Sequence, residues 1–144
     1  ETGEIWVHEH GPRGGDEINV IKAGKNYGWP LITYGINYSG TTITDITAKD
    51  GLEQPLYYWV PSIAPSGMAF STSGIYPKWK DNLFVGSLRF EYLERLELKN
   101  NTVVKREKVL DSIGRVRNVE QGPDGYLYLG VEGKGILKII PKSY

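Results

Sequence analysis

The chain has 144 residues, 17 basic and 17 acidic side chains, a net charge of zero and no cysteine. This balance gives no electrostatic reason to expect nucleic acid or an anionic membrane as a partner. The lack of cysteine excludes disulfides, thiolate catalysis and cysteine-ligated metals, and no apolar stretch approaches the roughly 20 residues of a membrane span.

Short β patterns bounded by turn residues follow one another along the chain, and no segment has a sustained helical period. Several patterns alternate apolar and polar residues, and a loop-rich stretch of about 28–60 separates the second from the third. In chain order, the predicted strands are Glu4–Glu9, Asp16–Lys22, Gly67–Ser71, Asn82–Ser87, Leu93–Leu98, Val103–Leu110, Arg115–Glu120, Tyr126–Val131 and Gly135–Ile140.

Three places in the chain resemble one another. Gly3–Val7, Asp81–Val85 and Gly125–Leu129 each put a turn before a core strand with an aromatic residue at its centre, and Phe84 lies 44 residues before Tyr128. A period of roughly 40–50 residues with four strands per unit is typical of β-propeller blades. The sequence therefore predicts an all-β propeller fold.

The predicted strands fill about 2.5–3 blades. Residues 66–110 make one whole blade, residues 115–140 supply three strands of another, and residues 4–22 begin at the second strand of theirs. Open sheet edges of this kind invite pairing with another chain. We therefore expect residues 1–144 to be about half of a single propeller domain, truncated from a longer protein.

His8-Glu9-His10 puts two imidazoles on one face of a strand, because side chains alternate with a period of two. Two histidines with a nearby carboxylate, Asp16 or Glu17, could bind a transition metal. Ordinary polar residues at a strand end are the alternative, and a zinc site lacks a third histidine.

The loop Gly11–Glu17 is rich in glycine and lies between two predicted strands. Glycines let main-chain carbonyls face a ligand closely, and carbonyl oxygens with carboxylates suit a hard cation such as calcium. An ordinary hairpin loop is the alternative. No Gly-Lys-Ser/Thr follows, so a phosphate loop is excluded.

Arg115-Val116-Arg117 places two guanidinium groups on one strand face, and Arg89 after another strand could add a third charge. Neighbouring cations repel unless an anion lies between them, and arginine binds carboxylates bidentately. A polycarboxylate ligand is one interpretation, and solvated surface arginines are the other.

Pro61–Gly67 is a rigid, polar entry to a strand that could shape a pocket wall. Four nearby aromatic residues either stack on a planar ligand or pack in a core: Trp29, Tyr57, Tyr58 and Trp59. No Ser-His-Asp nucleophile can be assigned.

Five motifs together resemble the soluble glucose and aldose sugar dehydrogenases that depend on pyrroloquinoline quinone (PQQ), a family of six-bladed propellers. The motifs occur in the family's order over about residues 3–141: His8–Asn19, Gly24–Pro30, Ile63–Met68, Asn82–Leu88, and Gly114–Val119 with Gln121–Gly125. Each is weak alone, and the ordered set is specific. By resemblance the chain is the C-terminal portion of such a propeller.

The resemblance also implies ligands. Main-chain carbonyls of Gly11 and Pro12 would hold the cofactor's calcium, and Glu17 and Tyr27 would lie at a structural calcium. The implied cofactor-binding residues are Arg115, Arg117, Arg89, His10, Ser62 and Tyr57.

The implied chemistry is PQQ- and calcium-dependent oxidation of an aldose to its lactone, in a periplasmic or secreted protein with an unspecified electron acceptor. The family's catalytic histidine lies in the N-terminal half, before this chain begins, so we assign no catalytic base and expect the chain alone to be inactive. Val60 stands where the glucose-specific relatives carry an aromatic residue, which favours the broader aldose subgroup.

Two other functions remain open. A non-catalytic, calcium-binding propeller could act as a binding module, although the intact Arg115-x-Arg117 and Gly11-Pro12 argue against it. A calcium-dependent propeller hydrolase needs a cluster of carboxylates and amides around a central metal, and the sequence offers no clear set.

Overall fold

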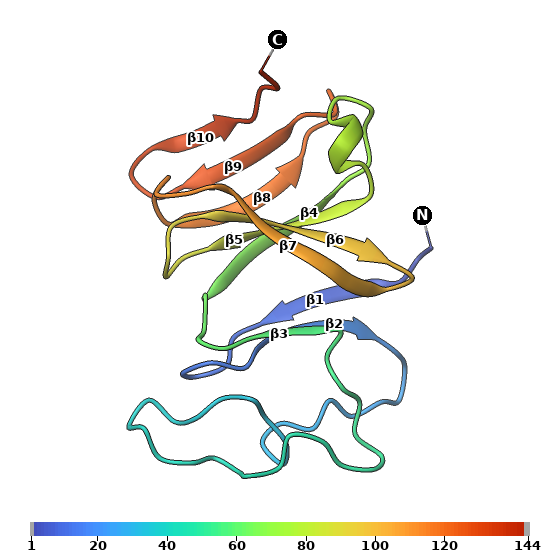
Figure 1. Ribbon diagram of the computed structural model, residues 1–144, viewed down its shortest axis with the longest axis vertical. Coiled ribbons are helices and arrows are strands. Elements are labelled where there is room, and N and C mark those ends of the chain that lie inside the picture. The colour runs from blue at the N-terminus through green and yellow to red at the C-terminus, as the bar shows by residue number, and fades with distance from the viewer. Residues whose placement is uncertain (1, 143–144) are drawn as a thin grey trace. The chain divides into compact units, whose positions relative to one another are not determined.

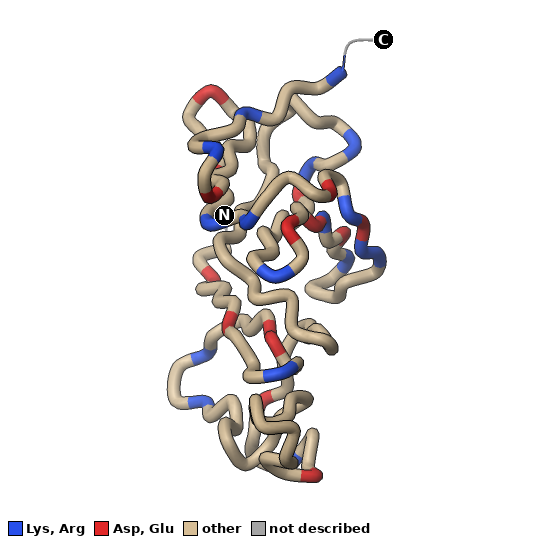
Figure 2. The backbone as a smooth tube through the Cα atoms, turned by 90° about the vertical axis from the view of Figure 1, so that its left-hand side faces the viewer, with Lys and Arg blue, Asp and Glu red and all other residues tan. Residues whose placement is uncertain are grey.

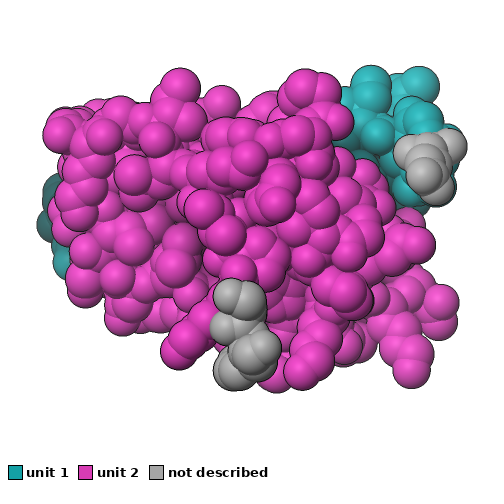
Figure 3. Space-filling model, turned by 90° about the horizontal axis from the view of Figure 1, so that it is seen from above, with its two compact units in different colours: residues 1–64 teal, residues 65–144 magenta. Residues whose placement is uncertain are grey.

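The computed structural model describes residues 2–142, which form three antiparallel sheets and one short 3-10 helix, η1 (Pro77–Trp79) (Figure 1). The chain divides into two compact units, residues 1–64 and residues 65–144 (Figure 3). The all-β prediction is therefore confirmed. Within residues 2–142, no helix has the length and apolarity to cross a bilayer.

The first unit contains one sheet of three strands in the order β1-β2-β3. These strands are β1 (Ile5–Glu9), β2 (Asp16–Ile21) and β3 (Tyr57–Trp59). In the β1–β2 hairpin Glu9 lies opposite Glu17, and Asp16 lies opposite Trp59 across β2 and β3. Buried Ile18, Ile32 and Ile63 join Trp59 in the apolar interior of this unit.

Strand β3 is absent from the sequence prediction, which placed residues 57–59 in a loop. A run of three aromatic residues is too short to reveal a period of two, and the pairing with β2 is a tertiary effect. With β3, the first unit contains a sheet of three antiparallel strands, one more strand than the sequence analysis predicted there.

The segment between β2 and β3 packs onto the β1–β2 turn, although its only strand-like feature within the described residues is a bridge between Ile36 and Thr42. Gly35 lies so close to the turn that a Cβ atom there would collide with the carbonyl oxygen of Gly14. This long loop therefore helps to fix the conformation of the glycine-rich turn.

The second unit contains a whole four-stranded blade and a three-stranded sheet, as predicted. The blade has the order β4-β5-β6-β7: β4 (Pro65–Ser71), β5 (Asn82–Ser87), β6 (Leu93–Lys99) and β7 (Thr102–Leu110). The other sheet has the order β10-β9-β8: β8 (Val116–Gln121), β9 (Leu127–Val131) and β10 (Gly135–Lys138).

One apolar cluster joins the two sheets of the second unit. Phe84 and Leu93 come from the blade, and Val116, Leu127 and Leu129 come from the three-stranded sheet. The repeated aromatic positions are not equivalent, however, because Phe84 is buried whereas Trp6 and Tyr128 are only half-buried. The repeat predicts strand position correctly and overestimates the burial of its central side chain.

Strand β6 contains two buried charged residues that its alternating sequence pattern does not predict. Glu94 and Arg95 are 1 % and 7 % exposed, although the pattern places one of them on the polar face. The Arg106 Nε donates to Glu94 Oε1 at 2.8 Å, and Arg95 Nη2 donates to Glu107 Oε2 at 2.6 Å. Pairing with β7 therefore gives both charged groups an ion partner, although Arg95 Nε stays buried without a hydrogen-bond partner. Basic and acidic residues are interspersed along the backbone (Figure 2).

A polar cluster on the β8–β10 sheet makes the stability of the second unit depend on pH. Asp124 Oδ2 accepts hydrogen bonds from Lys138 Nζ at 2.8 Å and from Tyr128 Oη at 2.7 Å. These two bonds, led by the one from Lys138, lower the pKa of Asp124 from 3.8 to about 2.

We expect Asp124→Asn to flatten the acid dependence of this stability. A depressed carboxyl pKa stabilises the folded state above pH 3.8, and this contribution disappears as the pH falls toward 2. Thermal unfolding at pH 5 and at roughly pH 2.5 should show a smaller difference in the variant than in the wild type. An equal difference in both proteins would contradict the assignment.

Candidate functional site

The glycine-rich turn between β1 and β2 is fixed by a buried carboxylate at its end. Asp16 is 0 % exposed, and its Oδ1 accepts the Gly11 N–H at 2.8 Å. Its Oδ2 accepts the Ser62 hydroxyl at 2.8 Å. The predicted calcium-binding turn and the predicted pocket residue Ser62 therefore share one anchor.

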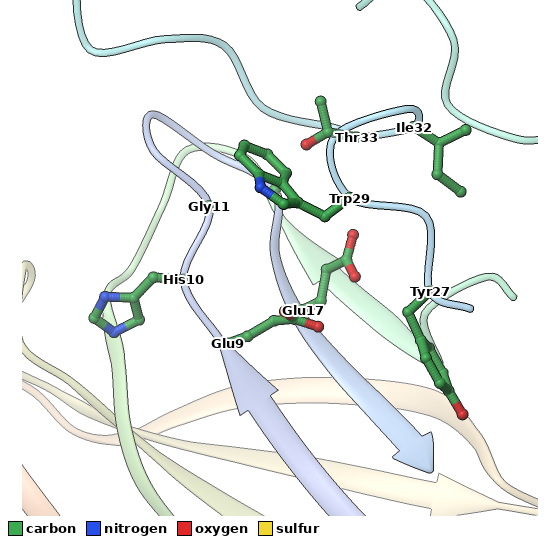
Figure 4. A pocket seen from close by; sticks show the side chains of 9 residues that line it. Glu9, His10, Gly11, Glu17, Tyr27, Trp29, Ile32 and Thr33 are labelled. Atoms are coloured by element: carbon green, nitrogen blue, oxygen red, sulfur yellow. The ribbon is translucent and has the colours of Figure 1, made fainter. Parts of the chain in front are cut away.

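A cavity of about 190 Å³ opens beside this turn (Figure 4). Four of the predicted cofactor-binding and metal-binding residues line it: His10, Gly11, Glu17 and Tyr27. The other lining residues are Glu9, Gly15, Trp29, Ile32 and Thr33. Pro12, Ser62 and Tyr57 do not line it, so the structure brings together only part of the predicted set within the first unit.

Two carboxylates face each other across the β1–β2 pair at this cavity. Asn19 Nδ2 donates to Glu9 Oε1 at 2.6 Å and to Glu17 Oε2 at 3.1 Å. Asn19 is 1 % exposed, and its Oδ1 has no hydrogen-bond partner. An unused buried oxygen acceptor beside two carboxylates is the chemistry that a hard cation selects.

The raised pKa of the Glu17 carboxyl also favours a cation at this place. Burial raises its pKa, the hydrogen bond from Asn19 lowers it by less, and the charge of Glu9 raises it further. A carboxylate that is destabilised by burial and by a like charge is stabilised by a bound cation. Glu17 is therefore a candidate ligand for a cation.

Tyr27 and His10 line the cavity without directing their polar atoms at the carboxylates. The Tyr27 hydroxyl donates to the Val20 carbonyl and accepts the Lys22 N–H, both at 2.8 Å. Figure 4 shows its hydroxyl and the His10 imidazole pointing away from Glu17. A metal-binding role of Tyr27 would therefore use its main-chain carbonyl.

The two histidines do not form a metal centre with side chains nearby. Within the described residues, no group of three or more His, Asp or Glu side chains could hold a metal ion. Burial, followed by the charge of His10, lowers the pKa of His8. A metal in this unit would need main-chain or amide oxygens in addition to carboxylates.

Tyr57 belongs to strand β3 and packs edge-on against buried Trp59, with ring centroids 5.0 Å apart. Tyr58 stacks on Tyr34 at 3.7 Å. These contacts favour packing over ligand stacking for the two tyrosines, whereas Trp29 lines the cavity and is 59 % exposed.

In the second unit, Arg115 and Arg117 converge on one carboxylate. Glu132 Oε2 accepts Arg115 Nε at 3.1 Å and Arg117 Nε at 2.9 Å, and Arg117 Nη2 also reaches this oxygen. The Glu132 N–H donates to the Arg115 carbonyl at 3.0 Å. The predicted pair of guanidinium groups therefore lies side by side, held by an anion.

The hydrogen bond from Arg117 is the largest cause that holds the pKa of Glu132 below its usual range. Both arginines remain about half-exposed, and the Nη atoms of Arg115 form no bond to Glu132 among the contacts described. Arg89 follows β5, and its guanidinium carbon lies 5.0 Å from the centroid of the Phe90 ring. The arginine pair can thus offer hydrogen-bond donors to a second anion.

Sequence reasoning gave no role to three residues that organise these places: Glu9 and Asn19 in the first unit, and Glu132 in the second. It considered Asp16 only as a possible ligand of a transition metal. For Glu9 the signal was available, because the two predicted strands that flank the glycine-rich turn form a hairpin in which Glu9 lies opposite Glu17. For Glu132 no local signal exists, because its position depends on the β8–β9 pairing.

Comparison with known proteins identifies the family. The family model described as "Glucose / Sorbosone dehydrogenase" matches residues 1–138. The chain belongs to this family. The resemblance drawn from the five sequence motifs is therefore confirmed.

Individual members of the glucose/sorbosone dehydrogenase family are similar over nearly the whole chain. Aldose sugar dehydrogenase YliI of Escherichia coli K12 is 46 % identical over 99 % of the chain and 40 % of its own length. A crystal structure of a glucose dehydrogenase superposes with a TM-score of 0.91 at 49 % identity, over 99 % of this chain and 42 % of that one.

The PQQ-bound form of an aldose sugar dehydrogenase from Streptomyces coelicolor superposes with a TM-score of 0.66 at 27 % identity. The match covers 96 % of this chain and 40 % of that one. The chain thus spans about 40 % of the length of the relatives it matches. The prediction of a partial propeller, with sheets resembling blades, is confirmed.

Proposed function

We propose that this chain supplies part of the cofactor and calcium sites of a PQQ-dependent dehydrogenase that oxidises aldose sugars to lactones. The observation that carries the proposal is the pair formed by Arg115 and Arg117 on a single carboxylate oxygen. Two guanidinium groups held side by side match a ligand with several carboxylates. Family membership and the PQQ-bound relative support the choice of ligand.

The first unit fits the two proposed calcium ions by the chemistry of its donors. Main-chain carbonyls of Gly11 and Pro12 would hold the calcium of the cofactor. Glu17 and Tyr27, which line the cavity, would hold the structural calcium, with the Glu9 carboxylate opposite Glu17. The orphaned oxygen of Asn19 and the raised pKa of Glu17 favour a cation here.

When bound, PQQ accepts the hydride of the sugar and calcium acts as a Lewis acid. The chain's own residues bind and orient: Arg115 and Arg117 hold the anionic edge of the cofactor, and Arg89 adds positive charge. His10, Ser62 and Tyr57 are proposed pocket residues. The proposal assigns no residue of this chain as the catalytic base.

Strands β1 and β10 lie at sheet edges within the described residues. We propose that they pair with strands of a longer polypeptide or of a second copy, as unpaired edges tend to do. A periplasmic or secreted location and the broader aldose specificity suggested by Val60 follow from the family resemblance.

The direct test is a titration of the chain with PQQ in the presence of calcium, followed by absorbance and calorimetry. The proposal expects saturable binding that shifts the absorbance of PQQ and weakens as salt is added. A chain that folds but leaves the PQQ spectrum and heat unchanged would contradict it.

Glu132→Gln should strengthen the binding of PQQ. The substitution removes the anion that neutralises Arg115 and Arg117, so the attraction for a polycarboxylate increases by roughly threefold at low salt. Titrations at low and high salt check this, with Glu120→Gln as an exposed control from the same sheet. Weaker binding in Glu132→Gln would mean that Glu132 chiefly aligns the two arginines.

A further inference from the structure

Asp16 is a buried carboxylate that accepts hydrogen bonds from four donors and that has no place among the predicted calcium-binding and cofactor-binding residues. Its Oδ1 accepts the Gly11 N–H at 2.8 Å. Its Oδ2 accepts the Ser62 hydroxyl at 2.8 Å, the Ile63 N–H at 2.7 Å and the Ala64 N–H at 2.9 Å. The two oxygens of one side chain thus serve two different segments.

The segment on the Oδ2 side needs such an anchor. Ala64 has a φ angle of 50°, in the left-handed region that residues with a Cβ atom rarely adopt. This conformation persists only where the surroundings determine it, and Asp16 accepts hydrogen bonds from the consecutive N–H groups of Ile63 and Ala64. Ser62 is held in the same arrangement because its hydroxyl also accepts the Ala64 N–H, at 3.2 Å.

The segment on the Oδ1 side is equally constrained. Gly11 is buried, and a Cβ atom there would collide with the carbonyl oxygens of Gly14 and Gly15. The Gly15 N–H donates to the Trp59 carbonyl at 2.8 Å, which ties the turn to β3. Asp16 therefore joins two stiff segments through a rigid and fully buried side chain.

We propose that Asp16 is a positioning residue that couples the Gly11–Pro12 turn to Ser62–Ala64. A cation held by the carbonyls of the turn would then also order the segment that carries Ser62. The inference rests on the calcium part of the proposed function, and it adds a residue that connects the metal turn to the pocket wall.

An ionised carboxylate is required for this coupling. All four partners are used as donors, and a carboxylate accepts at both oxygens. An asparagine would turn its NH₂ group toward either Gly11 or the Ser62–Ala64 segment, so it would keep one segment and release the other. Asp16→Asn therefore breaks the link between Gly11 and the Ser62–Ala64 segment with almost no change in side-chain volume.

The experiment measures calcium binding to the whole chain by calorimetry, together with amide hydrogen exchange at Gly11, Ile63 and Ala64 with and without calcium. In the wild type, calcium is expected to slow exchange at all three amides. In Asp16→Asn, calcium affinity is expected to fall about tenfold, and calcium should no longer slow exchange at Ile63 and Ala64.

Two controls separate positioning from general destabilisation. Glu94→Gln removes a buried carboxylate from strand β6 in the second unit, and Asp45→Asn removes an exposed one from the first. Both should keep the wild-type affinity and exchange response. If Asp16→Asn does not fold, the comparison is repeated with Ala64→Gly in both proteins, because glycine removes the steric cost of the positive φ.

Each outcome has a distinct meaning. Wild-type affinity and a wild-type exchange response in Asp16→Asn would overturn the coupling while leaving the proposed calcium site intact. A wild-type chain that binds no calcium would reject the calcium part of the proposed function and the coupling with it. The PQQ titration, which does not depend on Asp16→Asn, would then decide the remainder.

Discussion

Replacing both Arg115 and Arg117 with glutamine should reduce PQQ affinity by about a hundredfold or more. A hydrogen bond to a charged partner contributes about 1.5–3 kcal/mol, so each lost arginine corresponds to roughly tenfold or more in affinity. The two side chains converge on Glu132, so a ligand at the same place would meet both guanidinium groups. Titration of PQQ by calorimetry measures the loss.

The single variants and a charge control sharpen this test. Arg117 makes two contacts to Glu132 and Arg115 makes one, so Arg117→Gln should cost at least as much affinity as Arg115→Gln. Lys99→Gln removes an exposed positive charge from the same unit and should change affinity by less than about twofold at physiological salt. Equal losses in all three variants would indicate nonspecific attraction and refute a defined arginine site.

The second large effect is expected for Glu9→Gln, which should act in opposite directions on stability and on calcium binding. Without calcium, the substitution removes the repulsion between Glu9 and Glu17 and should leave the unfolding temperature unchanged or higher. With calcium, the loss of one carboxylate should weaken binding by roughly tenfold or more. Unfolding measured with and without calcium gives both quantities.

This pairing of effects distinguishes a ligand from a structural residue. A purely structural Glu9 would lower the unfolding temperature in both conditions by the same amount. Asp50→Asn, an exposed change in the same unit, should leave both temperatures unchanged. If Glu9→Gln binds calcium as tightly as the wild type, Glu9 is not part of the site.

Most of the fold was predictable because most strand pairs of this protein are local hairpins. The repeat around Phe84 and Tyr128 placed the whole blade and the three-stranded sheet that follows it, since turn signals and alternation act over neighbouring residues. Strand β3 was not predictable in this way, because Tyr57–Trp59 pair with Asp16–Ile18 across a long irregular loop.

The parts of the candidate site that form a local sequence motif could be predicted from the sequence. The parts that depend on burial and on contacts with distant segments could not. The glycine-rich turn and the Arg-x-Arg pair are visible as residue types at fixed spacing. The roles of Asp16 and Glu132 depend on burial and on contacts with distant segments, which no local pattern records. For Glu94 the local pattern was misleading. Alternation suggests a solvated face, whereas Glu94 is buried and accepts a hydrogen bond from Arg106.

The most direct test of the central claim joins this chain to the rest of a relative. In E. coli aldose sugar dehydrogenase YliI, the matching 40 % of the protein would be replaced by residues 1–144, and aldose oxidation would be measured with an artificial electron acceptor. We predict sugar oxidation that requires both PQQ and calcium and disappears when Arg115 and Arg117 are replaced. A folded chimera that oxidises no aldose with both present, or one whose activity survives the loss of both arginines, would contradict the account.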